Sequence, residues 1–358
     1  MIKIAQVNTW SEPFTDFRTG GLLSSINYIS QDLAAHGIIT DKYFFEWRGK
    51  VRKYHQQDFK ALTPQDIEVL NGYDLVIFST AGSAKDHKEE NPMWRIHLNN
   101  LKVPFFVQIH DEDELKSLRY AKEFFEHPMC KLIMPITDGI GNAFGINKFN
   151  VPSLTYPAYS VTNMPDPEAH RTKVDKVVTA CRLTARKRVK ELVLAAKDIH
   201  DAGFGLEING AEASFFYCRD LKERSNEYWK FNGQFTDKGA VFSDAKFLWN
   251  ATSLKKKAFY PRVEISSVEG AFYGCVLILN RETTPSYIDD SCAILIDPFD
   301  LNSADPMRNL ISRLIECKDK SVEMNNNFIN AIKSELSKNI TMLIEQINLV
   351  TGNTKCVA

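Results

Sequence analysis

The sequence has little excess charge of either sign and lacks a long apolar run. Its 44 Lys and Arg residues nearly balance 45 Asp and Glu residues, which gives a formal net charge of −1. Proteins that bind nucleic acid by bulk attraction are usually basic, so any DNA contact must come from local basic patches. No apolar run approaches the roughly 20 residues of a membrane helix, and the N-terminal residues are too polar for a signal peptide. We therefore expect a cytoplasmic protein without membrane contact.

The sequence also lacks paired cysteines and a nucleotide-binding glycine fingerprint. Its seven cysteines are scattered, and no two have C-x-x-C spacing. This pattern argues against a zinc site and against a secreted disulfide framework, and it favours buried, reduced thiols. The absence of G-x-G-x-x-G argues against a nicotinamide oxidoreductase. We expect neither a metal nor a cofactor.

The sequence does contain two successive alternations of strands and helices within its 358 residues. Strands are expected at 2–7, 75–78, 103–109 and 131–136, then at 174–180, 205–209, 275–280 and 292–296. Helical spacing of apolar residues follows the first strand, up to Gly37, and recurs at 189–200 and 307–349. Such alternation predicts parallel, doubly wound sheets.

A proline-rich stretch at 156–167 separates the two alternations and indicates a linker. We predict an α/β chain with one Rossmann-like domain at 1–160 and a second at 168–335. The remaining residues, 336–358, are expected to form a helix that packs back on the first domain. Two such domains leave a cleft at the carboxyl ends of their strands, where open α/β sheets bind ligands.

Arg182 and Lys187 follow the first strand of the second alternation and suit a diphosphate. The alternative is a solvated basic helix start. Glu264 and Glu269 precede an apolar strand, where carboxylates can bind sugar or ribose hydroxyls. Their alternative role is helix capping.

Candidates in the first alternation are less specific. Gly20 and Gly21 lie between a strand and a helix, where backbone N–H groups can approach an anion, although a plain tight turn has the same sequence. His110 and Asp111 end a strand and are candidates for acid–base chemistry or acceptor binding, with a hydrogen-bonded loop histidine as the alternative.

Basic residues interleaved with aromatic ones form two candidate DNA contacts. Such surfaces suit phosphate contacts and base stacking. The alternative is solvated charge at the rim of a core. The residues are Arg48, Lys50, Arg52 and Lys53 in the first group, and Lys255 and Lys256 in the second.

Together these motifs resemble the two-domain GT-B glycosyltransferases, and in particular the DNA α-glucosyltransferases of T-even phages. Four segments carry the resemblance. They are Val107-Gln108-Ile109-His110-Asp111 with Leu118-Arg119, Arg182 with Lys187, Gly210-Ala211-Glu212, and Glu264 with Glu269 and Gly274. The two glutamates five residues apart are the most specific feature.

The resemblance implies a retaining, metal-independent transfer from a UDP-sugar to 5-hydroxymethylcytosine in double-stranded DNA. We expect the protein to be a monomer. It implies that Glu264 and Glu269 hold the sugar and the ribose, and that Arg182 and Lys187 neutralise the diphosphate. Glu212, Gly20 and Gly21 would complete the donor site. Asp111 with His110 would lie beside the acceptor hydroxyl, and Arg119 would contact DNA.

The transferred sugar stays open between glucose and arabinose, because the glycine loop and the residues around Glu212 depart from the glucosyltransferase pattern. Two other functions also remain. A GT-B transferase that acts on a glycan or lipid would share the donor site. A non-catalytic nucleotide- or DNA-binding protein is disfavoured because the chain carries both anion-binding and sugar-binding groups.

Overall fold

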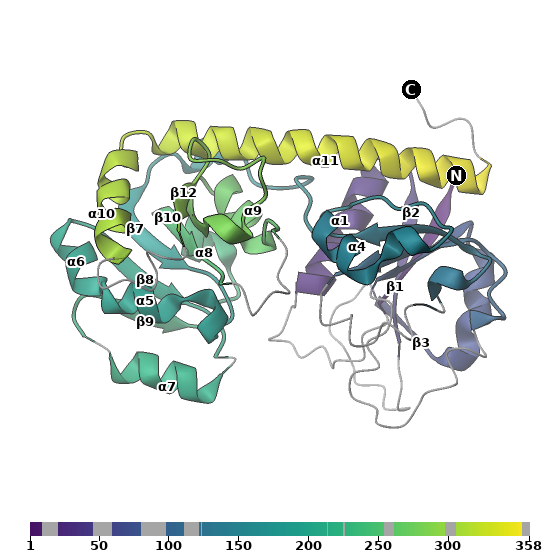
Figure 1. The fold of residues 1–358 in the computed structure, drawn as a ribbon, viewed down its shortest axis with the longest axis horizontal. Coiled ribbons are helices and arrows are strands. Elements are labelled where there is room, and N and C mark those ends of the chain that lie inside the picture. The colour runs from purple at the N-terminus through teal and green to yellow at the C-terminus, as the bar shows by residue number, and fades with distance from the viewer. Residues whose placement is uncertain are drawn as a thin grey trace. The chain divides into compact units, whose positions relative to one another are not determined.

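The computed structural model describes residues 1–8, 21–45, 59–79, 98–110, 122, 124–212, 214–224, 226–253, 261–297 and 306–352. It divides into two compact units, which are treated separately below. Unit 1 comprises Met1–Thr162 and Glu335–Ala358, and unit 2 comprises Asn163–Ser334. Each unit contains a parallel six-stranded sheet (Figure 1).

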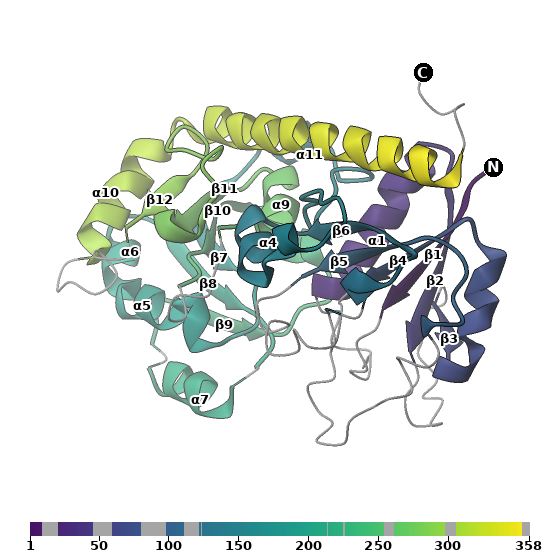
Figure 2. The ribbon, with the colours of Figure 1, turned by 45° about the vertical axis from the view of Figure 1, so that its right-hand side comes forward.

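The sheet of unit 1 has the strand order β3-β2-β1-β4-β5-β6. Its strands are β1 (Lys3–Asn8), β2 (Ile39–Phe45), β3 (Phe59–Leu62), β4 (Leu75–Ser79), β5 (Phe105–Ile109) and β6 (Cys130–Pro135). Strands β4 and β5 are buried along their whole length, as expected of parallel strands covered on both faces. Figure 2 shows β4, β5 and β6 side by side.

Helices α1 (Gly21–Ala35) and α4 (Asp138–Phe144) belong to unit 1, with 3₁₀ helices at Pro64–Gly72 and Ile146–Lys148. Two residues after α1, Gly37 has a φ of 73°, a left-handed conformation that glycine adopts without the penalty of a Cβ. Near the end of α1, the buried carboxylate of Asp32 accepts hydrogen bonds from the hydroxyls of Tyr156, Ser160 and Thr162. These bonds fasten the last segment of unit 1 before the chain enters unit 2.

The sheet of unit 2 has the strand order β12-β11-β10-β7-β8-β9. Its strands are β7 (Val174–Thr179), β8 (Gly205–Asn209), β9 (Lys230–Gly233), β10 (Ala245–Asn250), β11 (Val276–Asn280) and β12 (Ile294–Ile296). Its helices are α5 (Val189–Leu194), α6 (Ala196–Asp201), α7 (Phe215–Glu223), α8 (Lys238–Phe242), α9 (Ile265–Phe272) and α10 (Pro306–Cys317), with 3₁₀ helices at Pro167–His170, Ala185–Lys187 and Arg281–Thr283. The long helix α11 (Ser321–Thr351) begins in unit 2 and ends in unit 1.

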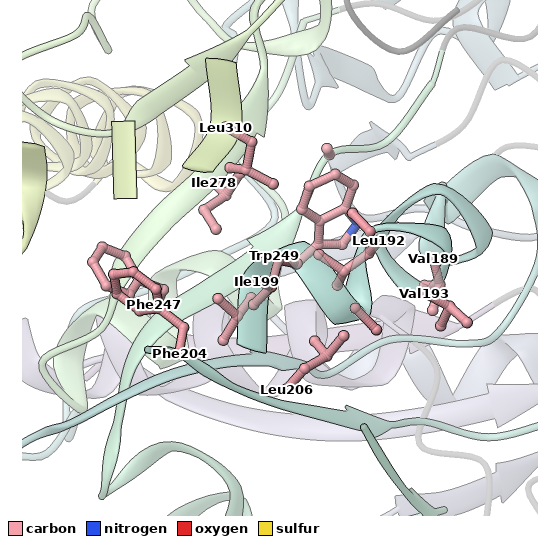
Figure 3. Close-up of a cluster of buried hydrophobic side chains, with 14 of the residues drawn as sticks. Val189, Leu192, Val193, Ile199, Phe204, Leu206, Phe247, Trp249, Ile278 and Leu310 are labelled. Atoms are coloured by element: carbon pink, nitrogen blue, oxygen red, sulfur yellow. The ribbon is translucent and has the colours of Figure 1, made fainter. Parts of the chain in front are cut away.

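A continuous apolar core supports the sheet of unit 2 (Figure 3). Phe247 and Trp249 of β10 are almost fully buried in it, together with Leu192 of α5 and Ile199 of α6. Full burial of one such side chain stabilises the fold by about 1.5–3 kcal/mol. The Trp249 indole N–H donates to the carbonyl of Lys187 at 3.1 Å, so this core also fixes the turn that carries Lys187.

The predicted α/β class with two Rossmann-like halves is confirmed. The helical tail consists of α10 and α11, and unit 1 resumes at Glu335, inside α11 and next to the boundary expected at 336. Two details differ from the sequence-based expectation. The helix expected at 189–200 is broken at Ala195 into α5 and α6. Strands β2, β3, β9 and β10 were not predicted.

Candidate active site

Most predicted donor residues of unit 2 lie at or near the carboxyl edge of its parallel sheet. Arg182 and Lys187 follow β7, and Glu212 follows β8. Glu264 directly precedes α9, and β11 is the next strand after that helix. In open α/β sheets this edge is where ligands bind, because the loops after the parallel strands meet there.

Lys187 and Glu264 form an ion pair at the centre of this edge. Both side chains are largely shielded, with 14% of Lys187 and 22% of Glu264 exposed. Burial alone would raise the pKa of the Glu264 carboxyl. The Lys187 ammonium, together with Arg262 and the Thr252 hydroxyl, lowers the pKa by more than burial raises it, and the resulting pKa is about 2. Glu264 is therefore a carboxylate at neutral pH.

Glu264 occupies the N-cap position of α9, yet its side chain makes no capping hydrogen bond. Instead, one carboxylate oxygen binds Lys187 and the other accepts a hydrogen bond from the Thr252 hydroxyl at 2.8 Å. The capping alternative is therefore wrong for Glu264. The carboxylate is held at the sheet edge and not against its own helix.

Asn250 and Thr252, which sequence reasoning missed, complete the network. Lys187 Nζ lies 3.2 Å from the Thr252 hydroxyl and 3.4 Å from the Asn250 carboxamide oxygen. The Asn250 amide donates to Ser267 at 2.7 Å and to Ser266 at 3.1 Å. In the sequence, both residues follow the apolar run Phe247–Trp249. That position indicates a place at the carboxyl edge of the sheet only once β10 is identified as a strand.

Glu269 lies inside α9, one turn beyond Glu264, and does not open the helix. Its side chain is 8% exposed and pairs with Lys238 of α8 at 2.5 Å. Lys238 was not predicted either, and nothing in its local sequence distinguishes it from a surface lysine. Each glutamate thus has its own lysine partner, although Glu269 is more deeply buried than Glu264.

Arg182 and Glu212 are exposed, on two loops joined by backbone hydrogen bonds. The Leu183 N–H donates to the Ala211 carbonyl at 2.8 Å, which fastens the loop after β7 to the loop after β8. Gly210 permits this approach, since a Cβ there would lie 1.9 Å from the carbonyl oxygen of Cys181. Glu212 forms an ion pair with Lys222 at 2.6 Å.

A small pocket opens beside the ion pair. It combines hydroxyl, amide and charged groups with an apolar wall, a composition suited to a polar ligand such as a sugar. Its lining consists of Asn250, Thr252, Arg262, Val263, Glu264, Ser267, Leu279, Thr283, Thr284 and Pro285.

In unit 1, His110 directly follows β5 and is partly buried. Its Nε2 lies 2.8 Å from the carboxamide oxygen of Gln108, the fourth residue of β5. Gly21 is the first residue of α1. Gly20, Asp111, Arg119 and the basic residues Arg48, Lys50, Arg52, Lys53, Lys255 and Lys256 lie outside the described residues.

Within the described ranges, no group of three or more His, Cys, Asp or Glu side chains could hold a metal ion. The helices in the same ranges include none that is both long and apolar enough to span a membrane. Metal independence of the reaction therefore remains an expectation from the resemblance.

The sequence matches no protein-family model, and a search of curated protein sequences gave no match. Solved structures are similar over nearly the whole chain. An alpha-glucosyltransferase in complex with UDP and a 13-mer DNA containing an HMU base has a TM-score of 0.72 at 14% identity, covering 97% of this chain and 99% of that one. HepE from Anabaena in complex with UDP has a TM-score of 0.66 at 14% identity, covering 97% and 100%.

A glycosyltransferase from Rickettsia africae is similar as well, with a TM-score of 0.66 at 10% identity and 99% of both chains covered. This chain has the GT-B fold. The predicted resemblance to GT-B glycosyltransferases is confirmed at the level of the fold.

Proposed function

We propose that this GT-B protein is a glycosyltransferase that moves a sugar from a UDP-sugar to the hydroxymethyl group of 5-hydroxymethylcytosine in double-stranded DNA. The observation that carries the proposal is the pairing of Lys187 with Glu264 at the carboxyl edge of the unit 2 sheet. A cation for the diphosphate and a carboxylate for sugar hydroxyls adjoin there, which are the two groups that a sugar nucleotide requires.

In this proposal Lys187 and Arg182 stabilise the charge that develops on the departing diphosphate, the main electrostatic task when a phosphate leaves. The bond between the anomeric carbon and the diphosphate oxygen breaks, and a bond to the acceptor oxygen forms. The acceptor proton passes to a base beside it, for which His110 and Asp111 are the candidates. We further propose retention at the anomeric carbon and no metal requirement.

The DNA acceptor is supported by the similar alpha-glucosyltransferase, which was solved in complex with DNA. HepE and the Rickettsia glycosyltransferase share the fold, and a glycan acceptor is the second candidate because a GT-B transferase that acts on a glycan would share the donor site. The donor chemistry of unit 2 is the same for both acceptors.

The test is a transfer assay on duplex DNA that contains 5-hydroxymethylcytosine, with UDP-glucose and UDP-arabinose offered separately. Digested nucleosides are then weighed by mass spectrometry, and duplex DNA with plain cytosine is the control. A hexose or pentose gain on the modified base alone supports the proposal and identifies the sugar. UDP binding without any gain on DNA would refute the DNA acceptor and leave the glycan acceptor as the next to test.

A further inference from the structure

Three polar residues lie together at the carboxyl ends of two neighbouring strands in unit 1. Ser79 ends β4, and Gln108 of β5 is its partner in the parallel register. Both side chains are fully buried. The Ser79 hydroxyl donates to the Gln108 carboxamide oxygen at 3.4 Å, and the same oxygen lies 2.8 Å from Nε2 of His110.

The chemistry of these groups determines where the His110 proton lies. A carboxamide oxygen only accepts hydrogen bonds, so the short contact requires a proton on Nε2 of His110. In a neutral imidazole with its proton on Nε2, Nδ1 holds the basic lone pair. The tautomer of a histidine is generally set in this way by the hydrogen bond that its other nitrogen makes.

The contact with His110, and not burial alone, distinguishes Gln108 from the other residues of β5. Its neighbours along β5, Phe105, Phe106, Val107 and Ile109, are all apolar and fully buried. A buried carboxamide destabilises the fold for each of its groups that is left without a hydrogen bond. Among the described residues, the Gln108 amide nitrogen has no partner, so an apolar side chain would serve a purely structural strand better.

We propose that Gln108 is a positioning residue that fixes the ring orientation and the Nε2–H tautomer of His110. The inference rests on the proposed function, in which His110 lies beside the acceptor hydroxyl. The hydrogen bond from Nε2 to Gln108 then leaves Nδ1 as the nitrogen that can accept a proton. Ser79 supports the arrangement by orienting the carboxamide.

The test uses full-length protein and compares Gln108→Met, which keeps the volume but removes the acceptor, with Gln108→Glu, which keeps an acceptor oxygen. Gln6→Met is the matched control, because Gln6 of β1 is an equally buried carboxamide and no described residue bonds its side chain. Nitrogen-15 nuclear magnetic resonance of labelled histidine reports the tautomer, and His110→Phe assigns the signal. Steady-state kinetics on the modified DNA reports function.

We expect wild-type protein, Gln108→Glu and Gln6→Met to carry the proton on Nε2, and Gln108→Met to show a mixture of tautomers. Gln108→Met should lower kcat/KM about tenfold while KM for the UDP-sugar stays within about twofold, since the charged residues proposed to bind the donor are in unit 2. Gln108→Glu should restore much of the loss, and Gln6→Met should leave turnover near wild type.

A proton on Nδ1 in wild-type protein would overturn the proposal, because Gln108 would then be the donor. An unchanged tautomer in Gln108→Met, or equal losses of turnover in Gln108→Met and Gln6→Met, would overturn it too. The resonance measurement needs no substrate, so the tautomer of His110 can be determined even where no acceptor is glycosylated and the proposed function fails.

Discussion

Glu264 directly precedes α9, but its carboxylate binds Lys187, which lies 77 residues earlier in the sequence. The pair joins the loop after β7 to the helix before β11. The two charges are largely shielded from solvent, so removal of either partner would leave the other charge without compensation. Any anion that binds Lys187 must compete with Glu264.

Replacing Glu264 with Gln should therefore strengthen the binding of UDP without a sugar, while it weakens sugar transfer. The amide no longer neutralises Lys187, so more of the ammonium charge is available to the diphosphate. We expect roughly a tenfold lower Kd for UDP, equivalent to about 1.4 kcal/mol. Isothermal titration calorimetry measures the Kd, and Glu223→Gln on α7 is the control. Weaker UDP binding in Glu264→Gln would contradict this competition.

The same pair predicts how stability depends on pH. The folded-state pKa of Glu264, about 2, lies below its ordinary value of 4.5. A depressed carboxyl pKa adds stability above the ordinary pKa, and that stability is lost as the pH falls through the folded value. Wild-type protein should thus lose about 2–3 kcal/mol more than Glu264→Gln between pH 5 and pH 2. Urea denaturation at several pH values measures the difference, and parallel curves for the two proteins would argue against it.

Gly210→Ala should destabilise the protein and impair donor binding. The new Cβ would meet the backbone carbonyl of Cys181, which cannot move without separating the loops that carry Arg182 and Glu212. We expect a loss of about 1–3 kcal/mol, as for overpacked sites. Gly205→Ala, at the first residue of β8, is the matched control, because its Cβ would meet only the Lys176 side chain, at 3.5 Å or more. Equal melting temperatures for the two variants would refute the prediction.

Thr252→Val should reduce transfer with little change in stability. The substitution keeps the side-chain shape and removes the hydroxyl that donates to Glu264 and lies 3.2 Å from Lys187. We expect kcat/KM to fall about tenfold, with the free energy of unfolding within about 1.5 kcal/mol of wild type. Thr341→Val, on the exposed side of α11, is the control. Full activity of Thr252→Val would show that the Thr252 hydroxyl does not contribute to transfer.

Much of the fold can be predicted from the sequence where strands are continuous apolar runs. Leu75–Phe78 and Cys275–Asn280 coincide closely with β4 and β11, because a strand buried on both faces has little room for polar residues. Strand β9, with exposed polar positions at the sheet edge, carries no such signal. Strand β10 was missed because no Gly or Pro marks its short apolar run.

The candidate site was predictable only in part, for a related reason. Lys187 and Glu264 could be named from their places after a strand and before a helix. Asn250 and Thr252 depend on the register that places β10 between β7 and β11, which is a tertiary property. Lys238 reaches Glu269 from another helix, and no local pattern encodes that approach.

The long helix α11 has a consequence for the order in which the protein can be completed during synthesis. Its first residues belong to unit 2, and its last residues are grouped with unit 1, where Leu336, Leu343 and Ile347 are buried. Domains generally fold from the N-terminus as the chain emerges. Unit 1, although made first, lacks part of its apolar covering until the ribosome has passed the whole of unit 2. During synthesis, unit 1 therefore remains incompletely covered until the second half of α11 has been made.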